Sequence, residues 1–294
     1  MQAASKARLE LLAAAALFST GGAAIKACPM SGFHVAGLRS LFATLAFLLF
    51  VRSARAWPTR QEWLVGVAYA ATLTLFVLAN KETTAANTIF LQSTAPLYIL
   101  LASPFFLNER IRARDVLFML VMAGGLALCF VDEARGTSTA PRPVLGNVLA
   151  LASGVSWAAT VMGLRALGKK SADGKVKSSL GAVVAGNALT FVVCAPLMGT
   201  FPSGSTIDWT MLVYLGVFQI ALAYLFVTAA LAALPAFEAS VILLVEPVLN
   251  PLWAWTIHGE TPGKWALVGG AILVLATTAK TILDTRRESA ADSC

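Results

Sequence analysis

Long apolar runs recur along the whole of this 294-residue chain, and no other feature limits its fold as strongly. The length of each run is similar to the length that an α-helix needs to cross a bilayer, which is about 20 residues. Only 13% of the residues are charged, about half the share found in soluble domains. The runs are continuous rather than alternating, which favours helices over a β-barrel. The sequence therefore predicts an all-α integral membrane protein.

Polar segments with turn and charge signals divide the chain into ten predicted transmembrane helices. The predicted spans are 7–25, 34–51, 62–79, 86–107, 115–131, 144–165, 179–199, 209–230, 236–257 and 265–283. With the N-terminus in the cytoplasm, 16 of the 22 lysines and arginines fall in inner segments and five in outer ones. Cytoplasmic loops carry such an excess of basic residues, so both termini are predicted to be cytoplasmic. The net charge of +7 then needs no nucleic acid or other acidic partner.

Two segments of the chain share one pattern. Pro96 is followed thirteen residues later by Glu109, and Pro247 is followed thirteen residues later by Glu260. This common offset of 151 residues indicates two related halves. Five spans per half is an odd number, so the second half is predicted to be inverted relative to the first. The predicted division is 1–134 for the first five-helix repeat, 135–143 for an external linker, 144–284 for the second repeat and 285–294 for a cytoplasmic tail.

Three further motifs accompany this duplication. The sequence SGVSWAA at 153–159 has a weaker counterpart, LFSTGGA, at 17–23, and CPMSGFHVAGLRSLFA occupies 28–43. In this order, and together with the two Pro-to-Glu segments, the motifs resemble the EamA family of the drug/metabolite transporter superfamily. The resemblance covers nearly the whole chain and is strongest to YddG-type exporters of aromatic amino acids. It implies a multi-pass secondary transporter of the bacterial inner (plasma) membrane, which exports amino acids and related metabolites by alternating access.

The predicted substrate cavity lies near the bilayer centre, at the depth of Pro96 and Pro247. A proline-interrupted helix frees backbone carbonyls, which are tolerated there only against protein or a water-filled space. The alternative is that these prolines only kink packed helices. The side chains expected to line the cavity are Ser19, Thr20, Phe90, Gln92, Thr94, Tyr98, Trp157, Gln219, Tyr224 and Glu246.

Glu246 is the most informative of these residues, because a charged residue at the centre of a span costs roughly 2.5–3.5 kcal/mol on insertion scales. Three roles stay open from the sequence: binding a substrate ammonium group, accepting a coupling proton, or forming structural hydrogen bonds as a neutral carboxyl. Among the aromatic residues, Trp157 is the strongest candidate for stacking on substrate. It is predicted mid-span, away from the interfacial belts that tryptophan usually occupies.

Three charged residues are candidates for a gate or a charge pair near the outer surface: Arg39, Lys81 and Glu82. Arg39 is predicted about one and a half turns below that surface. It either reaches the interface or a helix end, or it binds a substrate carboxylate. Lys81 and Glu82 follow the third span, where an interfacial ion pair is the simpler interpretation.

Other functional classes find little support in the sequence. The chain lacks the P-loop pattern, so it is not an ATP-driven pump by itself, and it implies no ATPase subunit. Its four cysteines and two histidines have no metal-ligand spacing, and neither a metal nor another cofactor is expected. A multidrug or other metabolite carrier of the same superfamily is the alternative function. A membrane-embedded enzyme would require clustered His, Asp or Glu residues, which the sequence does not show. The expected partners are a small-molecule substrate and the lipid bilayer.

Overall fold

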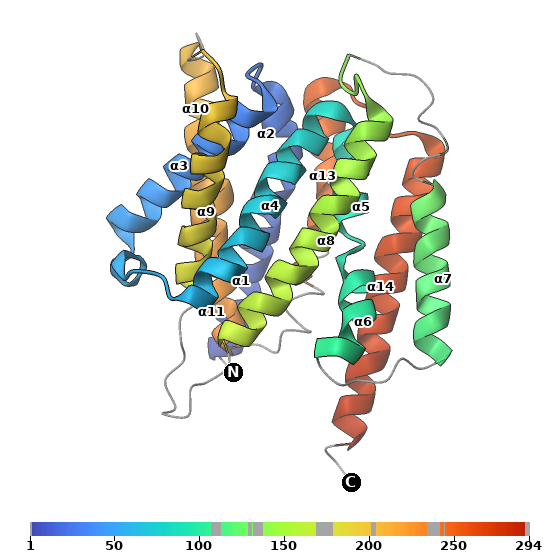
Figure 1. Ribbon diagram of the computed structural model, residues 1–294. Coiled ribbons are helices and arrows are strands. Elements are labelled where there is room, and N and C mark those ends of the chain that lie inside the picture. Colours follow the sequence, from blue (N-terminus) through green and yellow to red (C-terminus); the bar gives the residue numbers. More distant parts are fainter. Residues whose placement is uncertain are drawn as a thin grey trace.

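The structure is a computed structural model that describes residues 2–106, 113–128, 131, 138–168, 179–200, 204–233, 242–243 and 245–291. Its helices are α1 (Gln2–Ser19), α2 (Gly21–Ala27), α3 (Gly32–Phe50), η1 (Arg52–Arg55), α4 (Arg60–Glu82), α5 (Ala85–Gln92), α6 (Ala95–Phe106), α7 (Ala113–Leu128), α8 (Pro143–Gly168), α9 (Leu180–Cys194), η2 (Ala195–Leu197), α10 (Thr206–Tyr214), the π-helix η3 (Leu215–Leu222), α11 (Ala223–Ala233), α13 (Val245–His258) and α14 (Lys264–Ala291). The helices lie side by side in one bundle, and α1 begins and α14 ends at the same end of it (Figure 1).

The helical membrane architecture is confirmed in the described part of the chain. Six helical stretches there are long and apolar enough to cross a membrane: Ser5–Ala27, Gly32–Phe50, Arg60–Glu82, Pro143–Leu164, Leu180–Leu197 and Thr206–Ala230. Two shorter apolar helices, Val116–Leu128 and Lys264–Ala276, lie within other predicted spans. The count of ten spans and their inverted repeat stay predictions.

Polar side chains in the segments between the apolar runs cap the helices that begin there. Thr59 and Glu62 form a capping box at the start of α4, and Ser205 and Asp208 form another at the start of α10. In each box the hydroxyl accepts a backbone N–H of the first turn, while the carboxylate accepts the N–H of the capping residue. These local signals set the helix starts independently of the bilayer.

Three of the predicted spans are interrupted rather than continuous α-helices. Thr20 separates α1 from α2, residues 93–94 separate α5 from α6, and the π-helix η3 separates α10 from α11. Pro96 lies in the first turn of α6, where the missing N–H would have no partner within the helix anyway. Pro247 lies in the first turn of α13, and Pro251 lies inside that helix. The break at Pro96 therefore falls at the beginning of a helix.

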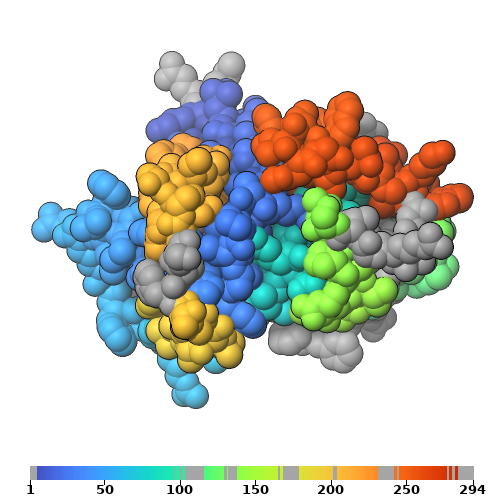
Figure 2. Space-filling view, turned by 90° about the horizontal axis from the view of Figure 1, so that it is seen from above, coloured from blue at the N-terminus to red at the C-terminus, as the bar shows by residue number. Residues whose placement is uncertain are grey.

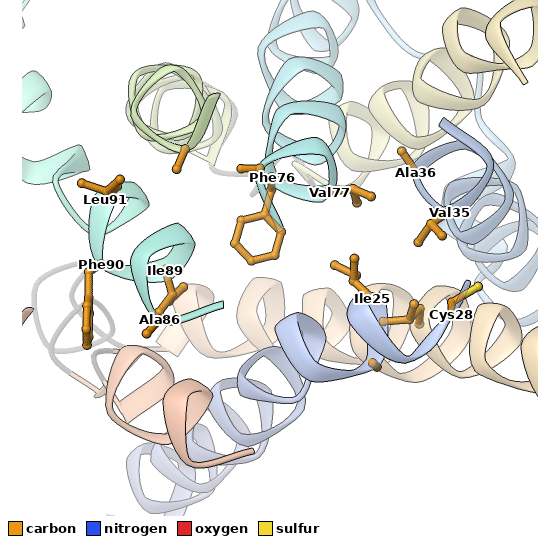
Figure 3. Packing of buried hydrophobic residues seen from close by; sticks show 14 of the residues in the cluster. Ile25, Cys28, Val35, Ala36, Phe76, Val77, Ala86, Ile89, Phe90 and Leu91 are labelled. Carbon is orange, nitrogen blue, oxygen red and sulfur yellow. The ribbon is translucent and has the colours of Figure 1, made fainter. Parts of the chain in front are cut away.

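Two clusters of buried apolar side chains hold the bundle together. One joins α2, α3, α4 and α5, and Figure 3 shows part of it, with labels on Ile25, Cys28, Val35, Ala36, Phe76, Val77, Ala86, Ile89, Phe90 and Leu91. The other joins α1, α3, α4, α9 and α11, and includes Phe18, Phe47, Tyr69 and Tyr224. Helix α4 packs closely against both α8 and α9, so it forms the centre of the bundle.

Glycine permits the closest of these approaches, between α4 and α9. A Cβ atom on Gly186 of α9 would lie 2.8 Å from the carbonyl oxygen of Gly66 and 2.5 Å from Cδ1 of Tyr69, both on α4. Small residues allow helix backbones to approach in this way within membranes. Neither neighbour can retreat without moving the α4 backbone.

We therefore expect Gly186→Val to lower the stability of the folded protein by about 1–3 kcal/mol, the range found for overpacked cores. The measurement is the melting temperature of the detergent-purified protein, followed by size-exclusion chromatography after heating. Gly124→Val is the matched control, because a Cβ atom on Gly124 meets nothing within 4 Å. Equal melting temperatures for the two variants would contradict the close helix approach.

Candidate functional site

A cavity of about 70 Å³ lies between helices that come from distant parts of the chain. It is bounded by α1, α3, α4, α5, α8, η3, α11 and α13. Its lining residues are Phe18, Arg39, Thr72, Leu73, Phe76, Gln92, Trp157, Gln219, Ile220, Tyr224 and Glu246. Five residues predicted to line the cavity are thus brought together: Gln92, Trp157, Gln219, Tyr224 and Glu246.

The volume of this cavity limits what it can hold in the present conformation. A dry cavity of about 150 Å³ accepts benzene, and pockets for drug-sized ligands span about 300–1,000 Å³. A space of about 70 Å³ has room for a few water molecules but not for an aromatic ring. The helices around it must therefore separate before any substrate of metabolite size can enter.

Glu246 places a carboxyl at the cavity wall from the first turn of α13. Within the described part of the chain, no hydrogen bond or ion pair engages its side chain. The neighbouring residue in sequence, Pro247, has no N–H, so the chain lacks one backbone donor beside the carboxyl. A carboxyl in this position can accept a hydrogen bond or an ion pair from a group that enters the cavity.

Arg39 also lines the cavity, at the depth along its helix that the sequence predicted, and the residue is only 1% exposed. Nη2 donates to the carbonyl oxygen of Leu73 at 3.2 Å, and Nη1 lies 3.5 Å from Oε1 of Gln219. The reason is orientation: Arg39 sits two turns into α3, on the side that packs against α4 and η3, so its long side chain extends into the bundle.

Two polar side chains and one backbone carbonyl, from three helices, form a hydrogen-bonded chain beside the cavity. Nε2 of Gln92 donates to Oγ of Ser153 at 2.7 Å, and that hydroxyl donates to the carbonyl oxygen of Thr72 at 3.3 Å. Gly154 makes this approach possible, because a Cβ atom there would lie 3.1 Å from the carbonyl oxygen of Leu91 at the end of α5. The SGVSWAA segment therefore packs directly on the interrupted helix.

Aromatic rings surround the apolar part of the cavity. Tyr224 makes edge-on contacts with Phe18 and Tyr69, at centroid distances of 5.2 and 5.1 Å. Trp157 is partly buried and packs against the cluster that contains Tyr224. The cavity thus presents both ionisable and aromatic side chains, which suits a ligand with a polar and an apolar end.

The other predicted cavity residues lie outside this lining, and most bond to nearby helices instead. Ser19 accepts a hydrogen bond from Nε1 of Trp253 at 3.0 Å, and the Thr20 and Tyr214 hydroxyls lie 2.9 Å apart. Thr94 donates to the carbonyl oxygen of Leu91 at 2.6 Å. Phe90 is buried against Gly270 of α14, and Tyr98 lies on α6. Ser19, Thr20 and Thr94 lie beside helix breaks, and their hydroxyls donate to backbone carbonyls there, which explains why these three residues do not face the cavity.

Lys81 and Glu82 do not join Arg39 in one charged group. Nζ of Lys81 donates to the carbonyl oxygen of Cys28. Glu82 instead forms a bidentate pair with Arg142, in which Nε lies 2.7 Å from Oε2. Lys81 and Glu82 therefore form no ion pair with each other in the described structure. The physical reason is that the ends of α4 and α8 meet at this surface, whereas Arg39 is turned inward.

Five lining residues were missed by the sequence analysis: Phe18, Thr72, Leu73, Phe76 and Ile220. Phe18 belongs to the LFSTGGA segment and precedes the predicted cavity residues Ser19 and Thr20, so this sequence neighbourhood was the available signal. Thr72 is a hydroxyl in mid-span, a weak signal. The remaining three are apolar residues in apolar helices, and the sequence alone does not distinguish them from lipid-facing neighbours.

Comparison with known families agrees with this architecture. The profile of the EamA-like transporter family matches residues 6–131 and 144–279. The chain belongs to the EamA-like transporter family. Members of this family are transporters, which supports a transport function rather than an enzymatic one.

Two relatives with assigned names are the pseudopaline exporter CntI proteins of Pseudomonas aeruginosa strains UCBPP-PA14 and PAO1. Each is 27% identical to this chain over 271 residues, which covers 89% of the chain and 91% of the relative. A crystal structure of a protein 22% identical in sequence superposes with a TM-score of 0.64, covering 97% of this chain and 99% of its own. The structural likeness supports the fold, and the named exporters are relatives within the same class of membrane protein.

Proposed function

We propose that this EamA-family protein exports amino acids, aromatic or other neutral ones, and related metabolites across the bacterial inner membrane by alternating access. The observation that carries the proposal is the Glu246 carboxyl, which shares one cavity with Trp157 and Tyr224. A carboxyl complements an ammonium group, and aromatic faces complement an apolar side chain. The resemblance to YddG-type exporters and the relatives named as exporters support the direction of transport.

A second substrate class is supported by those same relatives. They are named as exporters of pseudopaline, and they align with 89% of this chain. A carrier for another metabolite with charged groups would use the same cavity, because Arg39 and Glu246 can each bind a group of opposite charge. An exporter for purely lipophilic drugs has less support, since two charged side chains line the site.

Transport by the purified protein tests the proposal. Proteoliposomes loaded with one unlabelled amino acid should take up the same labelled amino acid by counterflow, with aromatic and neutral amino acids more active than acidic ones. Repeating the assay with and without an imposed pH gradient shows whether protons are coupled. Absence of counterflow for every amino acid, together with counterflow of an unrelated cation such as ethidium, would overturn the amino acid proposal.

The topology proposal is ten spans in two inverted repeats, 1–134 and 144–284, with a cytoplasmic tail from 285. The excess of basic residues in the inner loops supports it. In Figure 1, α1 begins and α14 ends at the same end of the bundle, which also agrees with this topology. Residues 165–178 are then cytoplasmic, and the linker near 138 is external.

Cysteine labelling of intact cells tests this orientation. In a cysteine-free background, a membrane-impermeant maleimide is expected to label Ser138→Cys but not Lys170→Cys. Labelling at 170 without labelling at 138 would reverse the orientation.

A further inference from the structure

The cavity holds a cationic side chain and a carboxyl that are not paired with each other. Arg39 and Glu246 both line it, and the described part of the chain contains no ion pair between them. A charged group inside a membrane protein usually pairs with an opposite charge or faces a functional cavity. These two groups, of opposite charge type and not paired with each other, can both be partnered by one ligand that carries a carboxylate and an ammonium group.

The hydrogen bonds of Arg39 are incomplete. Its guanidinium carries five N–H donors, but among the residues that the structure describes only Leu73 and Gln219 accept from it, and the contact to Gln219 is long at 3.5 Å. Nε is buried and has no hydrogen-bond partner in the described structure. A carboxylate is the acceptor whose two oxygens match the guanidinium fork.

Gln219 is held beside Arg39 by an unusual backbone. It lies in the π-helix of residues 215–222, and π-helical segments are frequent at functional sites. A Cβ atom on Gly21, at the break between α1 and α2, would lie 2.8 Å from Nε2 of Gln219. The helix break and the π-helix together place the amide between Gly21, at the start of α2, and Arg39.

We propose that Arg39, supported by Gln219, binds the substrate carboxylate, while Glu246 binds the substrate ammonium group. The site then selects zwitterionic α-amino acids and larger aminocarboxylates over molecules with only one of the two charges. This inference rests on the proposed amino acid transport, and it adds the group that recognises the carboxylate.

The test compares ligands that differ by one charged group. Binding of phenylalanine, phenethylamine and 3-phenylpropionate to the detergent-purified protein is measured by isothermal titration calorimetry. Hydrogen bonds to charged groups contribute about 1.5–3 kcal/mol, so Arg39→Gln is expected to weaken phenylalanine binding about 10- to 100-fold. Phenethylamine binding should be unchanged, because this amine has no carboxylate. Arg52→Gln, at an exposed position in η1, is the matched control.

The outcomes separate this inference from the proposed function. Equal loss of phenylalanine and phenethylamine would show that Arg39 only clamps α3 to α4 and would overturn the inference. If the wild-type protein binds none of the three ligands, the amino acid proposal itself fails. Should Arg39→Gln not yield folded protein, Arg39→Lys keeps the charge but removes the fork. It is expected to lower phenylalanine binding selectively by about tenfold, and an unchanged affinity would also count against the carboxylate role.

An independent observation lies at the end of the bundle opposite the termini. Nζ of Lys26 and Oε2 of Glu260 are 3.2 Å apart, and the two side chains are 5% and 3% exposed. Nζ also donates to the carbonyl oxygens of Thr83, at 2.8 Å, and of Thr139, while Oε1 of Glu260 accepts the N–H of Ala85 at 2.6 Å. This buried ion pair thus joins four segments: the end of α2, the turn after α13, the turn between α4 and α5, and the residues before α8.

The position of the pair relates it to the cavity. Glu246 lies in the first turn of α13 and Glu260 lies just past its end, about 20 Å further along at 1.5 Å per residue. Similarly, Phe18 lines the cavity and Lys26 lies about 12 Å further along α1 and α2. Seen from this end, the blue, teal, green and orange-red segments meet in one packed surface (Figure 2). The pair therefore lies beyond the cavity, toward this end of the bundle.

A buried ion pair rarely stabilises a protein more than apolar residues would, but removing one partner is strongly unfavourable. Such a pair is suited to stabilising one of two conformations of a transporter, here the one in which this end is closed. We infer that Lys26 and Glu260 form a latch that keeps this end of the transporter closed, and that their separation opens the cavity to this side. Glu260 is the last residue of the second Pro-to-Glu segment, so the latch gives that segment a function.

Cavity accessibility tests the latch without reference to any substrate. Thr72→Cys places one thiol in the cavity of a cysteine-free protein in proteoliposomes. Its labelling rate is measured with an impermeant maleimide, for each orientation of the inserted protein. Lys26→Glu or Glu260→Lys should raise the rate from the latched end at least about tenfold, because a like-charge pair cannot stay closed. The exchanged double variant, Lys26→Glu with Glu260→Lys, should restore the slow rate.

Lys6→Glu is the matched control, because the Lys6–Glu10 pair is on α1 at the opposite end and Lys6 is 79% exposed. Unchanged labelling in both single variants would overturn the latch. So would fast labelling in a folded double variant, since that result would mean that burial rather than pairing closes this end. If charge reversal prevents folding, Glu260→Gln provides the milder change, and a labelling rate equal to that of the wild type would again contradict the inference.

Discussion

Glu246→Gln is expected to lower the apparent affinity for zwitterionic amino acids about 10- to 100-fold, while an analogue without the ammonium group is transported as before. The range follows from the about 1.5–3 kcal/mol that a hydrogen bond to a charged group contributes. The Glu246 carboxyl lines the cavity and has no ion pair within the described structure. Glutamine keeps the shape and one acceptor oxygen but removes the charge that an ammonium group would meet.

Concentration dependence of counterflow in proteoliposomes provides the measurement for Glu246→Gln, with phenylalanine and 3-phenylpropionate as the matched pair of substrates. Glu62→Gln is a suitable control for the loss of a carboxylate, because Glu62 caps α4 and lies outside the cavity. Equal effects of Glu246→Gln on both substrates would argue against the ammonium-binding role.

The same variant distinguishes a coupling role for Glu246. If this carboxyl carries the coupling proton, uphill transport driven by a pH gradient should fail in Glu246→Gln while exchange down a substrate gradient survives. Unchanged affinity together with unchanged pH dependence would leave only the structural role. The two assays thus separate the three roles that the sequence left open.

The sequence predicted the helical membrane architecture because it follows from local patterns. Apolar runs of bilayer length specify helices, and Thr59 and Ser205 mark helix starts through their capping boxes. Trp157 and Glu246 stood out because their chemistry is unusual at the middle of a span. These signals depend on residue type and position along one helix, which the sequence contains directly.

The sequence did not predict which side chains share the cavity, because that depends on how each helix is rotated and where it is interrupted. The sequence left the partners of Arg39 open, and the structure shows that its guanidinium reaches Leu73 and Gln219 inside the bundle. Lys26 was counted only among the outer basic residues, although it pairs with Glu260, which is 234 positions away. Contacts over such separations are set by tertiary packing, so neither residue type nor spacing identified them.

Trp157→Ala is expected to reduce transport of bulky aromatic amino acids about tenfold while leaving expression and membrane insertion intact. Aromatic pairs contribute about 0.5–1.5 kcal/mol beyond the area they bury, which is up to roughly tenfold in affinity. Trp157 lines the cavity from α8 and is partly buried beside the cluster of Tyr224. A small substrate such as alanine offers no ring for it to contact, so alanine transport should change little.

The cavity volume is about 70 Å³, so the cavity must widen before an aromatic ring can contact Trp157. The selectivity of Trp157→Ala between substrates can therefore separate two causes of reduced transport. A general defect in opening would lower transport of alanine and phenylalanine alike, whereas a lost stacking contact lowers only the latter. Counterflow rates for the two amino acids, measured side by side, therefore identify the cause. Trp57→Ala is the matched control, since Trp57 is 85% exposed in the connection between α3 and α4. Normal transport of every aromatic amino acid tested in Trp157→Ala would assign Trp157 to helix packing alone.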